Sequence, residues 1–391
     1  MPELAKYKEC TGCMACVDNC PQLALQCSLN EEGHIVPVVD DTKCINCGLC
    51  EKTCPVVLKI NYSSSPLANA YAAWAKDDKL RKRSATAGAF AALAQKVLSE
   101  GGYVCGAANV DGIHVKHICI DRMEDIYLLQ GSKYTQSDTT GIYQTTYNHL
   151  KAGNTVLFSG TGCQVAGLFE FLGKRIFNGS LITVDLICGG VPSRLLIETF
   201  IKKAPFEVKR IVSFRSKEKG WSPNGFKYNL KVEDDSGIIH DYTGIRNLIT
   251  TGFACEMTNR YSCYECRFAG TRRLSDFTIG DYWGIKDYPE QHYNGVSVII
   301  AHNKKAESFL SSCNQYLVTK SADVLEVLAH NKRLALTKDK RYILPERKYL
   351  AFAFKRLRYK TLCKIYAFDF SNKSPWMLYK VFRAIVSRII K

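Results

Sequence analysis

Hydrophobic and polar positions along the middle of the chain predict helices and strands in turn. Residues 84–100 are rich in alanine, carry serine and threonine near their start and are followed by two glycines, which is typical of a helix. Short apolar runs with glycine-bearing turns predict buried strands at 102–110, 154–159 and 181–187. Because strands that alternate with helices build layered structures, we expect an α/β core with a largely parallel or mixed sheet.

The two ends of the chain follow different patterns. Residues 1–60 contain no long hydrophobic run, so bound metal clusters must stabilise them. The polar segment 61–70, which contains Pro66, predicts a linker, and the α/β domain is expected over 71–330. Residues 331–391 lack strand signals and predict a helical tail. The fold class is therefore α+β or α/β, with a small metal-stabilised domain before a mixed-sheet domain.

The expected last helix of the tail is amphipathic. Its apolar face is formed by Leu378, Val381, Phe382, Ile385, Val386 and Ile389. Its cationic face is formed by Lys380, Arg383, Arg388 and Lys391. Residues 331–391 carry +14 of the net charge of +16, because 17 lysines and arginines stand against three acidic residues. Such a helix suits packing on the core, an anionic membrane surface or an acidic partner. Nucleic-acid binding is not expected, because no recognised binding fold is present.

Composition places the chain among ordinary folded proteins. Its 391 residues are 46% hydrophobic and 23% charged, which suits two or three domains. The first residues lack the apolar core of a signal peptide, and no apolar run is long enough to cross a membrane. We therefore expect a cytoplasmic protein, with peripheral contact at the inner face of the membrane if the tail binds lipid. Its 18 cysteines are expected to bind metal more than to form disulfides.

Two cysteine runs dominate the first 60 residues. Both have the spacing C-x2-C-x2-C-x3-C-P, in Cys10, Cys13, Cys16 and Cys20 and again in Cys44, Cys47, Cys50 and Cys54. Three cysteines of such a run cap one 4Fe-4S cubane, and the fourth reaches the other cluster. One cluster is therefore assigned to Cys10, Cys13, Cys16 and Cys54, and the other to Cys44, Cys47, Cys50 and Cys20. Zinc uses similar spacings, but two identical runs closed by proline favour clusters.

Other residues near the runs have supporting roles. Gly12 and Gly48 lie inside the loops, where the backbone must approach inorganic sulfide. Cys27 lies outside both runs and is expected to be a small buried residue. The predicted domain is thus a two-cluster ferredoxin.

Four cysteines of the core are candidates for a further metal centre. Cys263 and Cys266 have ligand spacing, whereas Cys163 and Cys188 each follow a predicted strand. Open α/β sheets bind ligands at the carboxyl ends of their strands. Spacing alone leaves two alternatives open, which are a zinc site or no metal at all.

Two glycine-bearing segments are candidates for binding an anionic cofactor. Around Ser84, Thr86 and Gly88, the start of the predicted helix offers N–H groups and hydroxyls to a pyrophosphate, although an ordinary helix cap has the same features. The loop of Gly131, Ser132, Lys133 and Tyr134 combines a cation, a hydroxyl and an aromatic ring, but also suits a surface turn. No GxGxxG fingerprint follows a strand, so a Rossmann nicotinamide site is not predicted.

Residues 83–302 contain several separate motifs in a recognisable order. These are SATAGAFAAL at 84–93, GSKYTQS at 131–137, SGTGCQVAGL at 159–168, DLICGGVPS at 185–193, SCYECRFAGTRRLSDFTIGDYWG at 262–284 and GVSVII at 295–300. On these motifs the segment resembles the beta-subunit family of coenzyme F-420 hydrogenases and dehydrogenases. Members of that family are flavoproteins that move electrons between iron–sulfur clusters and a deazaflavin.

The resemblance implies two further cofactor sites. It implies a third 4Fe-4S cluster on Cys163, Cys188, Cys263 and Cys266. It also implies an FAD lined by Ser84, Thr86, Gly88, Gly131, Ser132, Lys133, Tyr134, Gly280 and Asp281. Three positions depart from the family pattern: Gly162 stands where proline is usual, Gly189 where histidine is common, and residues 84–88 where three serines and two glycines are usual.

The predicted function is that of an iron–sulfur flavoprotein oxidoreductase with a redox partner protein. Electrons would pass between the ferredoxin clusters, the third cluster and FAD, where a small molecule is reduced or oxidised. Relatives with a fused ferredoxin domain resemble proteins encoded among surface-polysaccharide genes, which implies a sugar or other small metabolite as substrate. The alternatives are a non-catalytic electron-transfer subunit and a pure cluster protein without flavin. No histidine or carboxylate constellation identifies a general acid or base, so the catalytic residues are unassigned.

Overall fold

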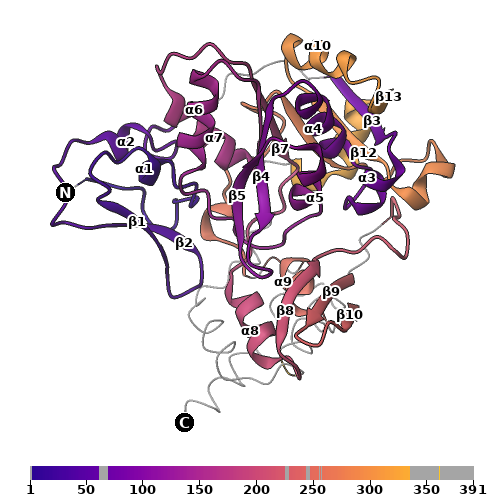
Figure 1. The fold of residues 1–391 in the computed structure, drawn as a ribbon, viewed down its shortest axis with the longest axis horizontal. Coiled ribbons are helices and arrows are strands. Elements are labelled where there is room, and N and C mark those ends of the chain that lie inside the picture. Colours follow the sequence, from indigo (N-terminus) through magenta and orange to yellow (C-terminus); the bar gives the residue numbers. More distant parts are fainter. Residues whose placement is uncertain are drawn as a thin grey trace.

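A computed structural model describes residues 2–60, 69–224, 229–243, 247–254, 256, 258–334 and 361. An eight-stranded sheet with the order β13-β3-β12-β11-β7-β6-β4-β5 lies at the centre of this structure (Figure 1). Its strands are β3 (Asn69–Ala75), β4 (Tyr103–Asn109), β5 (Val115–Ile120), β6 (Val156–Gly160), β7 (Leu181–Leu186), β11 (Phe277–Asp281), β12 (Ser297–Ala301) and β13 (Leu317–Ala322). The sheet is mixed, which confirms the predicted α/β core.

The parallel part of the sheet fixes the position of the candidate cysteines. Strands β4, β6, β7 and β11 run parallel, while β5 on one side and β12, β3 and β13 on the other are antiparallel to their neighbours. Parallel strands bring their carboxyl ends to one edge of the sheet. Strand β6 ends shortly before Cys163 and β7 shortly before Cys188, so both cysteines lie at that edge.

Helices cover both faces of the central sheet because alternate strand residues point to opposite sides. Leu157 of β6 packs with the alanine-rich helix α4 and with α5 and α10, whereas Phe158 packs with α6 and α7 on the other face. The helices of the core are α3 (Asp78–Arg83), α4 (Ala89–Ser99), α5 (Ile126–Leu129), α6 (Ile142–Lys151), α7 (Gly162–Leu172), α10 (Lys304–Ser312) and α11 (Val324–His330). Short 3-10 helices lie at Met123–Asp125, Tyr261–Cys263, Pro289–Asn294 and Lys332–Leu334.

The helix predicted at 84–100 begins five residues later than expected, at Ala89. Ser84 has an extended backbone and Gly88 has a φ of +82°, in the left-handed region that ends helical geometry. Residues 84–88 therefore form a loop between α3 and α4. The predicted helix-start site at Ser84 and Thr86 is wrong in this respect, because these residues precede the helix.

A second, smaller sheet lies beside the core. It has the order β10-β9-β8, from β8 (Val208–Ser213), β9 (Asn229–Asp234) and β10 (Ile239–Thr243). Helices α8 (Leu195–Lys203) and α9 (Leu248–Ala254) accompany it, and these strands and helices lie below the central sheet in Figure 1. Apolar residues of α8, α9, β8 and β9 form a second core together with Val115 of β5.

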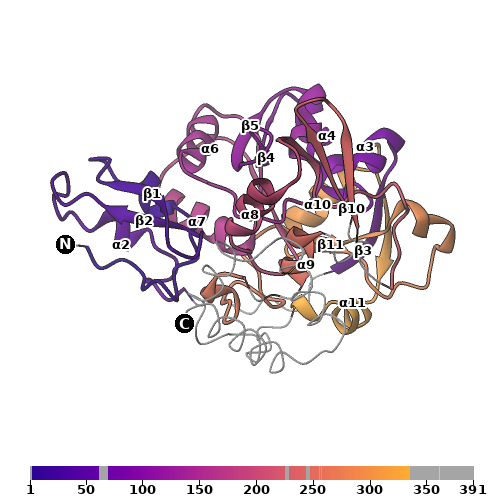
Figure 2. The ribbon, with the colours of Figure 1, turned by 90° about the horizontal axis from the view of Figure 1, so that it is seen from below.

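The N-terminal segment is a small unit docked against α6 and α7 (Figures 1 and 2). It consists of a hairpin of β1 (Leu25–Leu29) and β2 (Ile35–Val39), with the one-turn helices α1 (Ala15–Asp18) and α2 (Leu49–Lys52). The Asp18 carboxylate accepts backbone N–H groups of Gly141 and Tyr143 at 2.6 and 3.1 Å, at the start of α6. The Cys13 carbonyl accepts hydroxyls of Thr139 and Tyr143, each at 2.7 Å. Polar bonds thus fix the two parts together.

One cysteine prediction is wrong, and one cysteine pair was not expected. Cys27 is exposed on β1 and not buried. Cys105 and Cys119 face each other across the β4–β5 ladder and form a disulfide, which the sequence analysis did not expect.

Residues 61–68 of the predicted linker (61–70) and nearly all of the predicted tail, including the amphipathic helix at 376–391, lie outside the described residues. The last two linker residues, Asn69 and Ala70, belong to β3. Among the helices that the structure describes, none is long and apolar enough to span a membrane.

Candidate cofactor sites

The N-terminal cysteines fall into two groups, each with members from both runs. Cys10, Cys13, Cys16 and Cys54, here the inner set, lie within electrostatic range of one another. Cys20, Cys44, Cys47 and Cys50, here the outer set, line one small cavity. The structure therefore brings together the two ligand sets that the spacing predicts, including the exchange of Cys20 and Cys54 between them.

Left-handed residues shape both loops in the same way. Gly12 and Met14 have φ values of +69° and +59°, and Asn46 and Gly48 have values of +54° and +70°. These are the second and fourth residues after the first cysteine of each run. The repeated turns aim successive cysteines at one point, which is what a cubane requires. Only two of the four positions are glycine, so the glycine signal identified half of this geometry.

The two sets differ in exposure. Cys47 of the outer set is exposed, whereas Cys13 and Cys16 of the inner set are buried. Burial, with smaller contributions from Cys54 and Cys10, raises the pKa of the Cys13 thiol to about 12. A thiolate at this position therefore needs a compensating positive charge, such as iron, which fits the chemistry of a cluster ligand.

The four core candidates also come together. Cys163, Cys188, Cys263 and Cys266, here the core set, are near neighbours, although the chain separates the first and last by about 100 residues. Three polar groups point at their sulfurs. The N–H groups of Gly190 and Val191 donate to the sulfurs of Cys188 and Cys263 at 3.3 and 3.4 Å, and the Thr161 hydroxyl lies 3.1 Å from the Cys163 sulfur. Hydrogen bonds of this kind stabilise ligand thiolates and tune cluster potentials.

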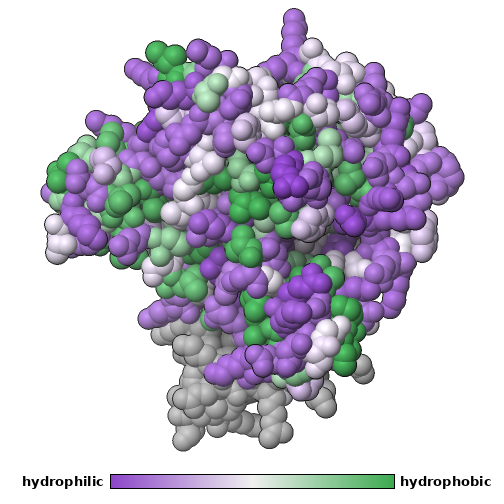
Figure 3. Space-filling model, viewed as in Figure 1, coloured by the Kyte–Doolittle hydropathy of each residue, from purple (hydrophilic) through white to green (hydrophobic). Residues whose placement is uncertain are grey.

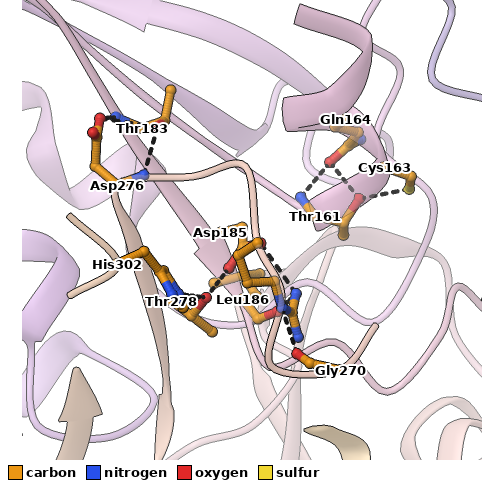
Figure 4. Close-up of polar contacts among 11 residues, drawn as sticks. Thr161, Cys163, Gln164, Thr183, Asp185, Leu186, Gly270, Asp276, Thr278 and His302 are labelled. Carbon is orange, nitrogen blue, oxygen red and sulfur yellow. Dashed lines mark hydrogen bonds and ion pairs between the residues drawn. The ribbon is translucent and has the colours of Figure 1, made fainter. Parts of the chain in front are cut away.

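A buried polar network around Asp185, which Figure 4 shows with Thr278 and His302, links β7 to the segment that follows Cys266. Arg273, seven residues after Cys266, donates to the Asp185 carboxylate of β7 at 3.1 Å, and both side chains are nearly inaccessible. The other Asp185 oxygen accepts the Thr278 hydroxyl at 2.5 Å, and that hydroxyl contacts His302 at 2.8 Å. Because β7 carries Asp185 and ends two residues before Cys188, this network ties the segment that follows Cys266 to the strand that leads to Cys188.

The two glycine departures from the family pattern have visible causes. A Cβ on Gly162 would lie 2.8 Å from the Phe268 carbonyl and 3.3 Å from Arg273. A Cβ on Gly189 would lie 2.3 Å from the Arg333 guanidinium, which donates to the Gly189 carbonyl at 2.6 Å. Neighbouring groups thus occupy the space that side chains at 162 and 189 would need.

No three or more His, Cys, Asp or Glu side chains converge on a single metal ion within the described ranges. This finding does not bear on the cysteine sets, because a cubane attaches each cysteine to a different iron atom.

The core set borders a large pocket. Its volume is about 610 Å³, which is typical of pockets for small molecules and cofactors. All nine residues that were predicted to contact a flavin line this pocket, namely Ser84, Thr86, Gly88, Gly131, Ser132, Lys133, Tyr134, Gly280 and Asp281. Cys163 and Cys188 line it as well. Segments up to about 200 residues apart in sequence therefore form one cavity beside the core cysteines.

Asp281 organises the polar wall of the pocket. Gly280 and Asp281 are the last residues of β11, and the three preceding residues of this strand are buried. The Asp281 carboxylate accepts the Thr86 hydroxyl at 2.6 Å and both ends of the Arg215 guanidinium at 2.9 and 3.0 Å. Burial acts to raise the pKa of Asp281, but Arg215 offsets this effect and holds that pKa below its ordinary value.

Lys133 is a buried cation at the pocket. Burial lowers the pKa of its ammonium group to about 7. The ammonium nitrogen donates to the carbonyls of Leu128 and Gln130 at 3.2 and 2.8 Å. In the described structure, Gln130 Oε1 and Thr135 Oγ1, of two other lining residues, are buried without a hydrogen-bond partner. Buried polar atoms without a partner beside the Lys133 ammonium group leave hydrogen-bonding positions open to a ligand.

Sequence reasoning missed several lining residues. Arg215, His117 and Trp283 carry no spacing signal and reach the pocket only through the fold. Asn331 and Arg333, which the sequence analysis assigned to the tail, also line it. His117 is buried between Ser137 and the Ser159 carbonyl, and burial lowers its pKa to about 4, so its ring is neutral at pH 7.

Comparison with known proteins agrees with this arrangement. Models of the N-terminal and C-terminal parts of the coenzyme F420 hydrogenase/dehydrogenase beta subunit match residues 70–142 and 153–324. A model of a 4Fe-4S dicluster domain matches residues 9–57.

Individual proteins were compared as well. No protein with a curated description matches the chain. A structure of the F420-reducing [NiFe] hydrogenase complex from Methanosarcina barkeri, obtained by xenon derivatization, contains a similar chain. The two chains are 19% identical with a TM-score of 0.46, over 68% of this chain and 89% of the other. On the family models, this protein belongs to the coenzyme F420 hydrogenase/dehydrogenase beta-subunit family and carries a 4Fe-4S dicluster domain.

Proposed function

We propose that the protein is an iron–sulfur flavoprotein oxidoreductase that exchanges electrons between ferredoxin-type 4Fe-4S clusters and FAD, and so reduces or oxidises a small molecule. The observation that carries this proposal is the position of Cys163 and Cys188. Both belong to the core set, and both line the pocket that the nine predicted flavin residues surround. A one-electron centre at this position would border a two-electron cofactor.

The order of the cysteine sets supports a continuous route for electrons. The outer set lies at the exposed end, and its Cys50 is near Cys16 of the inner set. Cys54 of the inner set packs in one apolar cluster with Cys163 and Cys266 of the core set. The proposed route therefore runs from the outer to the inner set, then to the core set and the pocket.

The residues of the pocket suit FAD. When bound, FAD exchanges an electron pair with a substrate and single electrons with iron–sulfur clusters. Lys133 would offer positive charge to an anionic part of the cofactor, and Gln130 and Thr135 would offer hydrogen bonds. The Arg215–Asp281 pair keeps the Thr86 loop in place in the wall of the pocket.

Iron, sulfide and flavin content test the proposal directly. Protein purified without oxygen is expected to hold about twelve irons per chain from three cubanes, with one bound FAD. About eight irons would exclude a cluster on the core set, and the absence of a flavin spectrum would exclude the flavoprotein assignment.

The affinity of the pocket for an anion is expected to fall as pH rises through about 7. The free energy of binding is more favourable while Lys133 carries its proton, and its pKa is about 7. With ADP as a probe of flavin-free protein, affinity falls about tenfold from about pH 6 to about pH 8.5 if binding raises this pKa by about one unit. Calorimetry measures the change. Lys133→Met is expected to bind ADP weakly and without that pH dependence, and an unchanged profile in this variant would exclude Lys133 as the cause.

An electron-transfer subunit without its own substrate is the second candidate. The exposed apolar residues Leu23 and Ile45 flank cysteines of the outer set, with 74% and 61% of their surface accessible, and apolar atoms are visible on this part of Figure 3. Such a surface suits a partner protein. Turnover of a small molecule by the purified chain alone favours the enzyme, whereas activity that requires a second subunit favours the carrier.

A further inference from the structure

Arg260 is a buried cation without a carboxylate partner. Its side chain has no accessible surface (0%), and none of the ion pairs among the described residues includes it. The other deeply buried guanidinium groups beside the pocket and the core set, Arg215 and Arg273, each bind an aspartate. An isolated buried charge costs several kcal/mol, so a native protein compensates it.

The side chain of Arg260 contacts Cys10 of the inner set and two residues beside it, Ile35 and Gln136. The Nε atom donates to the Cys10 carbonyl at 2.7 Å, and both terminal nitrogens donate to the Ile35 carbonyl at 2.8 Å. One terminal nitrogen lies 3.9 Å from the Cys10 sulfur. The other lies 3.2 Å from the Gln136 side-chain oxygen. These partners are neutral, apart from the sulfur when it is a thiolate.

The loop of the inner set closes tightly on this guanidinium. A Cβ on Gly12 would lie 2.7 Å from Arg260 and 2.4 Å from Gln136, and the φ of Gly12 is +69°. Glycine at this position therefore lets the backbone of the cluster loop reach the cation. The arginine comes from the core, three residues before Cys263, so it also links the inner and core sets.

We propose that the net negative charge of the cluster on the inner set is the counter-charge of Arg260, and that Arg260 raises the reduction potential of this cluster above that of the outer one. This inference rests on the proposed function, because it requires a cluster on the inner set and another on the outer set. Four thiolates leave a cubane with net negative charge, and reduction makes it more negative. In a medium of low polarity, a nearby cation stabilises the reduced cluster, which is the more negative form, more strongly than the oxidised cluster. Lys43 and Lys52, beside the outer set, are exposed, so solvent screens their charges.

The consequence is a direction for electron flow within the N-terminal domain. A low-potential one-electron donor protein would reduce the cluster on the outer set, where Cys47 is exposed. One electron would then move to the cluster on the inner set. No bond is formed or broken, no proton moves, and one cluster is oxidised as the other is reduced.

A redox titration followed by EPR tests this role in the intact protein. Arg260→Met removes the charge at similar length, and Arg260→Lys keeps it. We expect Arg260→Met to lower the equilibrium constant for reduction of the inner-set cluster at least tenfold, which is a shift of about −59 mV in its one-electron potential. The potential of this cluster in Arg260→Lys should stay near the wild-type value. The other clusters should keep their potentials. Arg81→Met is the matched control, because Arg81 is also buried and bonded only to neutral groups but lies elsewhere, against Gln291 and Gly295.

Other results would overturn the proposal. The first is a set of cluster reduction potentials that is the same in Arg260→Met and in the wild type. The second is a shift of all cluster potentials by the same amount. The third is an Arg260→Lys variant whose potentials equal those of Arg260→Met. If Arg260→Met loses the cluster altogether, iron content decides. Wild-type iron content in Arg260→Lys would support the role of the positive charge, and iron content as low as in Arg260→Met would exclude that role. Wild-type iron content separates the two proposals, since too little iron for two N-terminal clusters contradicts the proposed function itself.

Discussion

Replacing Cys263 and Cys266 together by alanine is expected to remove about four of about twelve irons per chain, the content of one cubane, while FAD stays bound. The sulfurs of these residues lie near Cys163, so their loss leaves the core set with two ligands. Neither residue lines the pocket, whereas Cys163 and Cys188 do, so this double variant spares the proposed flavin contacts. A reduced donor protein should then no longer bleach the flavin absorbance at the wild-type rate.

Iron analysis, flavin content and stopped-flow absorbance measure these three effects. Cys27→Ala is the control, because Cys27 is exposed and lies outside all three sets. It should keep full iron content and full electron transfer. Wild-type iron content in the Cys263→Ala/Cys266→Ala variant would show that the core set holds no cluster. Loss of the expected iron together with flavin reduction at the wild-type rate would show that the cluster on the core set is not on the electron route to the flavin.

Replacing Asp185 by asparagine is expected to destabilise the protein by about 3–5 kcal/mol, because it leaves the Arg273 guanidinium buried and unpaired. The side chains of Asp185 and Arg273 are only 2% and 3% accessible, so water cannot compensate the lost charge. The corresponding fall in melting temperature is about 10 °C. Anaerobic calorimetry measures it, and iron content reports whether the core set loses its geometry at the same time.

The double variant Asp185→Asn/Arg273→Met separates charge from packing. Removing both charges should recover part of the lost stability, since no unpaired ion remains. Glu124→Gln, which breaks the exposed pair with Arg122, should leave the melting temperature unchanged. A melting temperature of Asp185→Asn equal to the wild type would contradict the importance of the buried pair.

Local spacing predicted much of the N-terminal domain and of the sheet. In a C-x2-C-x2-C loop the ligands are covalent near-neighbours, so the chain itself determines that they can reach one cluster. The exchange of Cys20 and Cys54 between sets followed from the same pattern, and the structure places both accordingly. Strands β6 and β7 were recognised because short apolar runs between turns have few alternatives. The start of helix α4 at Ala89 was missed. The left-handed Gly88 separates residues 84–87 from the helix, and the composition of these residues does not reveal the break.

The candidate pocket shows where local reasoning ends. The nine flavin residues came from a resemblance, since helix caps and surface turns offer the same groups. Arg215 meets Asp281 only because the fold brings the segment that follows β8 to the end of β11. Lys133 is an unremarkable lysine in sequence, and only its burial makes its pKa unusual.

The sequence by itself therefore determined the metal-binding loops, the alternation of strands and helices, and the family motifs, because each depends on residues close together along the chain. Tertiary structure alone decided which buried charges meet. It pairs Asp185 with Arg273, and Arg215 with Asp281, and it leaves Arg260 facing the inner cysteine set. Such partners are about 60 to 250 residues apart, and no local pattern encodes them. A charge that water solvates in the unfolded chain acquires its partner only when folding excludes that water.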